Sequence, residues 1–253
     1  MPKHLYSLKI TREKPEFLAN NMFQFIKKLP GAQLPDIVDL RTSAKMPAVY
    51  DQGNLGSCTA QALCAAYQFM DTNDFSGSRL FLYYNERKLD NNIPDDTGAT
   101  LASGVKCLKK YGICTEDSWP YDITQFATEP PITCYQSALN EVCLKAQSIP
   151  NDRNTMRNVL NSGLPFVVGI QVYQSFESNA VAATGVVPMP KANETLFGGH
   201  AVLVVGFNHP KQQWIVRNSW GPSWGDGGYF YLPYKYLLNR NLCSDMWVLT
   251  KIT

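Results

Sequence analysis

The chain has 253 residues, of which 45% are hydrophobic and 17% are charged. This composition is typical of a globular protein, and the length suffices for one large domain or for two lobes that share an interface. The formal net charge of +2 is too close to zero to indicate nucleic acid or an acidic membrane as a partner. No apolar stretch approaches the roughly 18 residues that a membrane span needs, so we expect no membrane partner either.

The first ten residues contain no apolar core of the kind found in secretory signals, so the sequence predicts an intracellular protein. A lysosome-like compartment or a virus particle is not excluded. The seven cysteines form no CxxC motif and no Cys/His pair at zinc spacing, and the three histidines are isolated. We therefore expect no metal and no cofactor, and cysteines that are mostly reduced, with one or two disulfides left open.

The first half of the chain carries mainly helical patterns. An amphipathic pattern covers 17–29, and an extended stretch follows from 34 to 49. Glycines then break the chain before a run of small residues that favours a closely packed helix. The predicted helices span 58–70, 80–89, 101–110, 136–145 and 152–161. Gly112 is expected to end the third of them, because glycine readily adopts the left-handed conformation that follows a helix.

The second half changes to short apolar runs rich in β-branched and aromatic residues. The predicted strands include 166–172, 201–205, 214–216, 229–232 and 246–249. A helical half followed by a β-rich half predicts an α+β protein whose two lobes differ in class.

Four residues, in the chain order Gln52, Cys58, His200 and Asn218, supply the roles that acyl transfer needs. Glycines before Cys58 and helix-forming residues after it place its thiol at a helix N-terminus, which favours the thiolate. The Cys58 backbone amide and Gln52 are candidate donors to an oxyanion. His200, which we expect to open a strand, is the candidate base, and Asn218 can fix its ring while thiolate and imidazolium pair.

Each of these residues also has an ordinary structural interpretation. A single cysteine is most often a buried structural thiol, a histidine at a strand start is usually hydrogen-bonded within the fold, and an asparagine beside a serine usually belongs to a turn. These interpretations weaken together, because the ordered set would then have to arise by accident with matching flanks in three separate segments.

Those flanks resemble the active-site segments of the papain-like cysteine peptidases, the cathepsin family. The matching segments are 52–60, 199–202 and 218–221, with further agreement at 34–41, 111–113, 119–121 and 220–225. Cys58 and His200 lie 142 residues apart, within the roughly 130–150 of the papain signature. The resemblance implies a papain-like fold, with a helical left lobe, a β-barrel right lobe and the active site in the cleft between them.

The resemblance also implies a domain organisation and a reaction. Residues 1–33 would form an N-terminal segment and 34–253 the peptidase domain, with a helical lobe at about 50–150 and a β-rich lobe at about 151–253 plus 34–49. The protein would be a cysteine endopeptidase, a thiol protease that hydrolyses polypeptides through an acyl-enzyme. Gln52, Cys58, His200 and Asn218 would be catalytic. The implied substrate-binding residues are Gly56, Ser57, Gly98, Ala99, Gly169, Gly199, Ala201 and Trp220.

The sequence departs from the family pattern at several points. Leu55 stands where members usually have a cysteine, so the disulfide of that loop cannot form, and Thr59 replaces an aromatic residue. This is similar to a divergent branch without the usual active-site-loop disulfide. Small residues at Gly169 and Ala201 lead us to expect a roomy apolar pocket that prefers bulky apolar or aromatic side chains.

Two questions stay open at this level. Residues 1–33 are either a short pro-segment that lies along the cleft as an intramolecular inhibitor or an arm packed on one lobe. The alternatives to an endopeptidase are a papain-fold amidase or transferase and a catalytically silent papain-like binding protein.

Overall fold

The computed structural model describes residues 3–10, 33–71 and 75–252. The amphipathic pattern over 17–29 lies outside the described residues. The described chain combines helices with an antiparallel sheet, which confirms the predicted α+β class. Within these ranges, no helix is both long enough and apolar enough to cross a bilayer.

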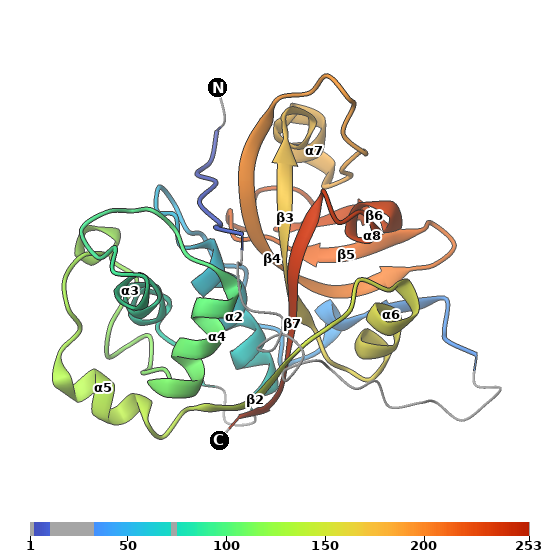
Figure 1. Cartoon of the computed structure of the whole chain (residues 1–253). Coiled ribbons are helices and arrows are strands. Elements are labelled where there is room, and N and C mark those ends of the chain that lie inside the picture. Colours follow the sequence, from blue (N-terminus) through green and yellow to red (C-terminus); the bar gives the residue numbers. More distant parts are fainter. Residues whose placement is uncertain (1–2, 11–32, 72–74, 253) are drawn as a thin grey trace.

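Helices α2 (Cys58–Met70), α3 (Arg79–Leu89), α4 (Leu101–Lys110) and α5 (Ile132–Ala138) form one lobe, together with the 3-10 turn η2 (Ile123–Gln125). Ser78 and Thr100 cap α3 and α4 by accepting hydrogen bonds from backbone amides in their first turns. Helix α2 is buried over most of its length between the other helices and the sheet (Figure 1). Its alanines allow this close approach.

The other lobe is built on a seven-stranded antiparallel sheet in the order β2-β7-β3-β4-β5-β6, with β1 paired to β4. The strands are β1 (Ile37–Asp39), β2 (Cys143–Ser148), β3 (Phe166–Tyr173), β4 (Leu196–Asn208), β5 (Gln213–Arg217), β6 (Tyr229–Pro233) and β7 (Cys243–Ile252). Helices α6 (Arg153–Asn161), α7 (Asn179–Thr184) and α8 (Tyr234–Leu238) accompany it, with the 3-10 turns η1 (Leu40–Thr42) and η3 (Gln174–Glu177).

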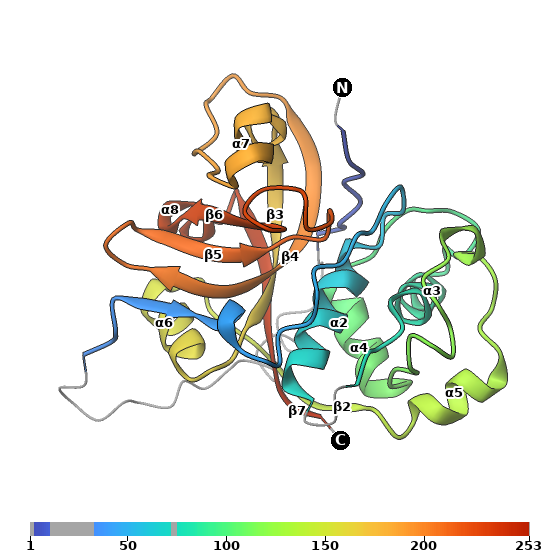
Figure 2. The same ribbon diagram turned by 180° about the vertical axis from the view of Figure 1, so that it is seen from behind.

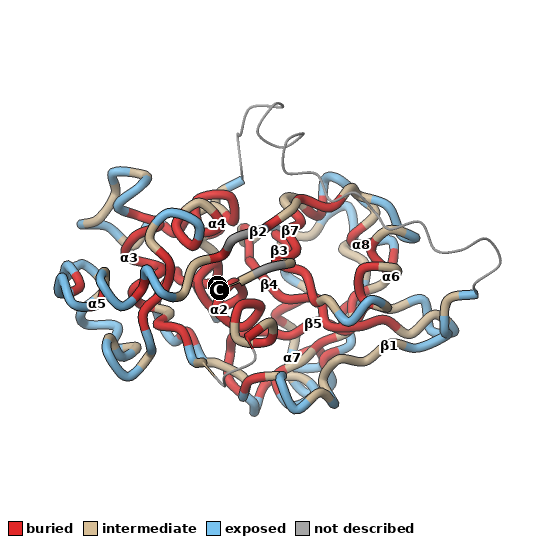
Figure 3. Tube along the Cα trace, turned by 90° about the horizontal axis from the view of Figure 1, so that it is seen from below, coloured by how far each residue is buried: buried red, intermediate tan, exposed pale blue. Residues whose placement is uncertain are grey.

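The hydrophobic core lies in two main parts. One part joins α2, α3 and α4 to the face of the sheet that carries Leu203, Val205 and Trp247. The other fills the β-rich lobe around Trp214 and Phe230. Viewed from below, buried residues occupy the middle of both lobes and the region where the lobes join, and most exposed residues lie in the outer loops (Figure 3). The two lobes are therefore packed firmly against each other along α2.

Two predictions about elements were wrong. The helix predicted over 136–145 ends at Ala138, and residues 143–148 form β2 instead. Antiparallel pairing of β2 with β7 there outweighs the helix propensity of the local sequence. Strand β4 begins at Leu196, so His200 lies inside the strand, opposite Ile170 of β3, rather than at its start. The division into domains stays a prediction.

The N-terminal residues 3–10 lie between the lobes, beside α2 on one side and β4 on the other (Figures 1 and 2). The backbone amide of Leu8 donates to the carbonyl of Gly199 at 3.1 Å, and that of Lys9 donates to the carbonyl of Ala99 at 2.9 Å. One short segment therefore bridges both lobes.

Candidate active site

Cys58 is the first residue of α2. Its thiol lies within hydrogen-bonding reach of the backbone amides of Cys58, Thr59 and Ala201, the last of which follows His200 in β4. Backbone amides at a helix N-terminus favour negative charge, so this position can stabilise a thiolate. The fold thus brings Cys58 next to the strand that carries His200.

His200 and Asn218 lie together, as the sequence predicted. Nε2 of His200 and Oδ1 of Asn218 are 2.8 Å apart, and both side chains are buried. The backbone amide of Ser219 donates to the same Oδ1 at 2.9 Å. These contacts orient the Asn218 amide so that its oxygen faces the ring, which requires the proton of a neutral His200 to reside on Nε2 and leaves Nδ1 as the acceptor.

Gln52 is buried beside the same turn. Its Oε1 accepts a hydrogen bond from Oγ of Ser219 at 2.6 Å, and its Nε2 donates to the carbonyl of Leu55 at 3.0 Å. The contact with Ser219 fixes which end of the amide carries the N–H groups. No sequence signal marks Ser219 as functional, because its position directly after Asn218 is equally typical of an ordinary turn.

Trp220 forms an aromatic wall beside His200. The two ring centroids are 4.9 Å apart, at an interplanar angle of 22°. The ring of His4, from the N-terminal segment, stacks on Trp220 with its centroid 3.8 Å away and an interplanar angle of 1°. The segment therefore reaches the surroundings of His200 directly.

Burial changes the ionisation of both reactive groups. It raises the pKa of the Cys58 thiol to about 12 and lowers the pKa of His200 to about 4, although the hydrogen bond that His200 donates to Asn218 opposes the latter shift. In the closed cleft, burial thus disfavours the charged forms of both groups, and the thiolate–imidazolium pair stays an expectation for the open site. Nδ1 of His200 has no hydrogen-bond partner within the described ranges. The physical reason is the closed cleft, which leaves Cys58 and His200 fully buried.

The segment contacts most of the predicted substrate-binding positions. Besides the bonds to Gly199 and Ala99, Oγ of Ser7 donates to the carbonyl of Gly56 at 2.9 Å. Gly98 adopts a φ of +69°, and a Cβ there would lie 1.7 Å from the carbonyl oxygen of Ser7. Only glycine permits this approach of the two backbones.

Leu8 fills an apolar pocket in the β-rich lobe. A Cβ on Gly169 would lie 2.6 Å from Cδ2 of Leu8 and 2.8 Å from Oγ of Ser244. Ala201 pairs with Gly169 across β3 and β4, and both Leu8 and Ala201 are buried in the same hydrophobic cluster. The absence of larger side chains at 169 and 201 is thus what makes room for a leucine.

The remaining predicted position, Ser57, directs its hydroxyl into the helical lobe. It bonds with the hydroxyl of Tyr121 at 2.5 Å and accepts from Nε2 of Gln61 at 3.0 Å. Thr59, which stands in place of the usual aromatic residue, donates to the buried carboxyl of Glu86 at 2.6 Å. Burial raises the pKa of Glu86 to about 8 against the opposing effect of this hydrogen bond.

A second set of contacts holds the start of the segment. Glu177 accepts hydrogen bonds from the backbone amides of Lys3 and His4 at 3.0 and 3.1 Å, and its carboxylate also contacts Nδ1 of His4 and the hydroxyl of Tyr6. Burial alone would raise the pKa of Glu177, but these hydrogen bonds outweigh it and keep the pKa below its usual range. No local pattern in the sequence marks Glu177, because its partners are more than 170 residues away.

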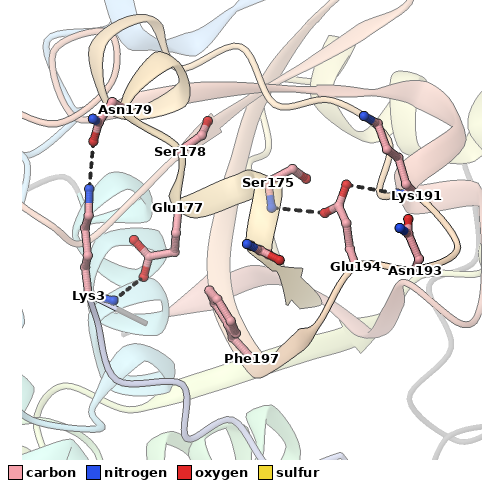
Figure 4. Close-up of a pocket in the computed structure, with 10 residues that line it drawn as sticks. Lys3, Ser175, Glu177, Ser178, Asn179, Lys191, Asn193, Glu194 and Phe197 are labelled. Carbon is pink, nitrogen blue, oxygen red and sulfur yellow. Dashed lines mark hydrogen bonds between the residues drawn. The ribbon is translucent and has the colours of Figure 1, made fainter. Parts of the chain in front are cut away.

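Glu177 also borders a polar cavity of about 570 Å³, which Lys3, Asn179, Glu194 and Phe197 line as well (Figure 4). As for metals, no group of three His, Cys, Asp or Glu side chains within the described ranges is arranged to hold an ion. All seven cysteines are buried, and none of them forms a disulfide with another described residue.

Comparisons with known proteins agree with this geometry. The family described as papain family cysteine protease matches residues 34–244. An uncharacterised peptidase C1-like protein of Acanthamoeba polyphaga mimivirus is 44% identical over 247 residues, which cover 91% of this chain and 79% of the relative. The crystal structure of xylellain, a cysteine protease from Xylella fastidiosa, superposes with a TM-score of 0.89 at 35% identity, covering 100% of this chain and 98% of that one.

A third similar structure is the proform of Amb a 11, a cysteine protease and ragweed pollen allergen. It superposes with a TM-score of 0.67 at 23% identity, covering 88% of this chain and 67% of that one. At this identity the likeness concerns the fold alone. Together these matches establish the papain-like fold that the sequence predicted.

Proposed function

The chain belongs to the papain family of cysteine proteases, and on that premise we propose that it is an endopeptidase acting through Cys58, His200, Asn218 and Gln52. The observation that carries the proposal is the 2.8 Å contact between His200 and Asn218, beside a thiol at the N-terminus of α2. It supplies an oriented base next to a nucleophile that backbone amides stabilise.

The proposed reaction has two halves. The Cys58 thiolate attacks the peptide carbonyl carbon, and the oxyanion that forms accepts hydrogen bonds from the Cys58 backbone amide and from Nε2 of Gln52. His200 gives its proton to the departing amine and leaves an acyl-enzyme. His200 then removes a proton from water, which attacks the thioester and releases Cys58.

We further propose that the N-terminal segment inhibits this site within the same molecule. His200 must protonate the leaving amine, so the leaving half of a substrate lies toward Trp220 and the acyl half toward Gly98 and Ala99. The segment runs from His4 on Trp220 to Lys9 at Ala99, which is the opposite direction. A reversed backbone places its amide nitrogens on the wrong side of Cys58 for proton transfer, so the segment blocks the cleft without being a good substrate.

The segment also supports a preference in the acyl half of the substrate. Leu8 occupies the pocket bordered by Gly169 and Ala201, so we expect bulky apolar side chains, leucine among them, to be preferred there. A peptide library with charged residues preferred at this subsite would contradict the expectation.

Labelling with a thiol-directed epoxysuccinyl probe, together with a fluorogenic peptide panel, tests the central proposal on wild type and Cys58→Ala. We expect the adduct on Cys58 and no turnover by Cys58→Ala. Activity that survives in Cys58→Ala would overturn the assignment of the nucleophile. Rapid acylation of Cys58 by non-peptide acyl donors without peptide cleavage would instead favour an amidase or transferase, and no labelling at all would favour a silent binding protein.

A further inference from the structure

Glu177 is an almost fully buried carboxylate whose hydrogen-bond donors come from the N-terminal segment. Its side chain is 6% exposed. The carboxylate accepts hydrogen bonds from two backbone amides and from the hydroxyl of Tyr6, and it contacts the ring of His4. When the segment leaves the cleft, this carboxylate loses these partners together. In the open cleft water takes the place of these donors, and a ligand that brings cationic or N–H donors can occupy the same positions through charge-assisted hydrogen bonds.

The position of Glu177 relative to the reacting groups defines which part of a substrate it meets. The His4 ring, which contacts Glu177, lies flat on Trp220, and Trp220 also stacks on His200. His200 protonates the leaving amine in the proposed reaction, so Glu177 stands on the leaving side of the cleft. The apolar pocket of Leu8 lies on the other side, at Gly169.

The cavity beside Glu177 extends this side of the cleft and is polar. Along one edge of the cavity, Nζ of Lys3 donates to Oδ1 of Asn179 at 2.9 Å, and the backbone amide of Lys3 donates to Glu177 (Figure 4). The volume of about 570 Å³ leaves space for side chains longer than those now present. Two basic side chains of the segment therefore bind in this site, and each has its own acceptor. Glu177 accepts from His4, and Asn179 accepts from Lys3.

On the basis of the proposed endopeptidase function, we propose that Glu177, Asn179 and the face of Trp220 form a subsite for basic side chains in the leaving half of the substrate. Histidine, lysine or arginine at the first or second position after the scissile bond binds there through the contacts that His4 and Lys3 make now. The preferred substrates thus carry an apolar residue on the acyl side and a basic residue just beyond the cleaved bond.

The test uses the full chain with Leu8→Asp, which is designed to displace the segment, combined with either Glu177 or Glu177→Gln. Internally quenched peptides keep leucine at the apolar subsite and carry His, Lys, Arg, Ala or Glu at the two positions after the scissile bond. We expect kcat/KM to be about tenfold higher for basic than for alanine peptides, because a charge-assisted hydrogen bond is formed, and the ratio to fall below about threefold in Glu177→Gln. Equal rates for basic and alanine peptides, or a ratio unchanged by Glu177→Gln, would overturn the proposal.

Glu194→Gln is the matched comparison, because Glu194 lines the same cavity but accepts from the backbone amides of Ser175 and Lys191. If Glu194→Gln loses as much of the preference for basic peptides as Glu177→Gln does, the carboxylates attract basic peptides only by their general charge. That result would contradict a specific subsite. If Glu177→Gln also loses cleavage of the alanine peptide, Asn179→Ala replaces it, since Asn179 is exposed, and a drop in the lysine preference of about threefold is expected.

Calorimetric binding of acetyl-His-Lys-amide and acetyl-Glu-Glu-amide to the Leu8→Asp, Cys58→Ala protein, which lacks the nucleophile, separates this inference from the proposed function. Tighter binding of the basic peptide that depends on Glu177 supports the subsite even if no peptide is cleaved, in which case only the endopeptidase proposal fails. Efficient cleavage without basic preference leaves the endopeptidase proposal intact and removes this one.

Discussion

The carboxylate of Asp96 faces the backbone amide of Gly56, and each of its oxygens lies 3.0 Å from that nitrogen. The hydroxyl of Tyr83 donates to the same carboxylate and in turn accepts from the amide of Gly98 at 3.2 Å. Asp96 thus ties the loop before Cys58 to the loop of Gly98. A charged hydrogen-bond network holds together the two backbones that line the helical side of the cleft.

Asp96→Ala is expected to lower the free energy of unfolding by about 1–3 kcal/mol, because the Gly56 amide and the Tyr83 hydroxyl lose a charged acceptor. Urea denaturation measures the change. Asp95→Ala is the control, since Asp95 is exposed and its contact with Arg87 uses the backbone carbonyl. Equal effects of the two substitutions would contradict the role of Asp96.

Ser219→Ala is expected to reduce kcat/KM by roughly tenfold with little effect on stability. The hydroxyl of Ser219 holds Oε1 of Gln52, and without it the amide can rotate away from the orientation that donates to the oxyanion. Gln52→Ala sets the upper limit of this effect. A Ser219→Ala enzyme that equals wild type while Gln52→Ala is impaired would show that the hydrogen bond does not position Gln52.

Leu8→Asp is expected to raise the rate of Cys58 labelling by at least about tenfold. A carboxylate cannot be accommodated in the apolar pocket beside Gly169 without a large desolvation cost, so the segment leaves the cleft. Leu5→Asp is the matched control, because Leu5 is 42% exposed and lies in the same segment. Labelling of both variants at the wild-type rate would mean that Leu8 does not hold the segment in place.

Closure of the segment is expected to depend on pH in both directions. The closed-state pKa of His200 is lowered to about 4, so protons bind better to the open state and closure weakens as pH falls from about 6.5 to 4. The closed-state pKa of Cys58 is raised to about 12, so the thiolate forms only in the open state and closure weakens as pH rises above about 9. Glu177, with its lowered pKa, adds to the weakening in acid.

Hydrogen exchange of the Leu8 and Lys9 amides, corrected for intrinsic rates, measures this equilibrium, because both are bonded only when the cleft is closed. Protection should be greatest between about pH 6.5 and 9. His200→Gln should remove much of the loss of protection at acid pH. Cys58→Ala should remove the loss of protection at alkaline pH. Protection that does not vary with pH in wild type would refute the linkage.

Glu86→Gln is expected to stabilise the fold at pH 8 but not at pH 4.5. Burial raises the pKa of Glu86 to about 8, so the wild-type fold loses stability as pH rises from about 4.5 to 8, whereas glutamine keeps the neutral form throughout. The difference at pH 8 should reach on the order of 4 kcal/mol. Urea denaturation at both pH values measures it, with the exposed Glu129→Gln as a control that should show no such difference.

The sequence identified the residues that meet at the centre of the cleft because each carries its own local signal. Cys58 follows glycines and begins a helix, and His200 and Asn218 sit in recognisable flanks. The α+β class could be predicted for the same reason, since helical and strand periodicities separate along the chain. The strand at residues 143–148 could not be predicted from the sequence, because only its pairing with β7 makes it a strand.

The sequence could not reveal the roles of Ser219, Glu177 and Asp96, because these roles depend on partners that are distant in sequence. Ser219 bonds to Gln52 across 167 positions, and Glu177 bonds to Tyr6 across 171. No local pattern distinguishes such a serine or glutamate from one that faces solvent. The burial of Cys58 was also not predicted, since the sequence could not show that the segment would seal the thiol from water.

That sealing has a consequence for the lifetime of the protein. Oxidants such as hydrogen peroxide attack the thiolate of an accessible cysteine, and the higher oxidation products are irreversible. In the closed cleft Cys58 is fully buried, and burial raises its pKa to about 12, so the group is neither reachable nor ionised. The segment that excludes peptides therefore also preserves the nucleophile, and a closed molecule should keep its latent activity through oxidative exposure that would destroy an open one.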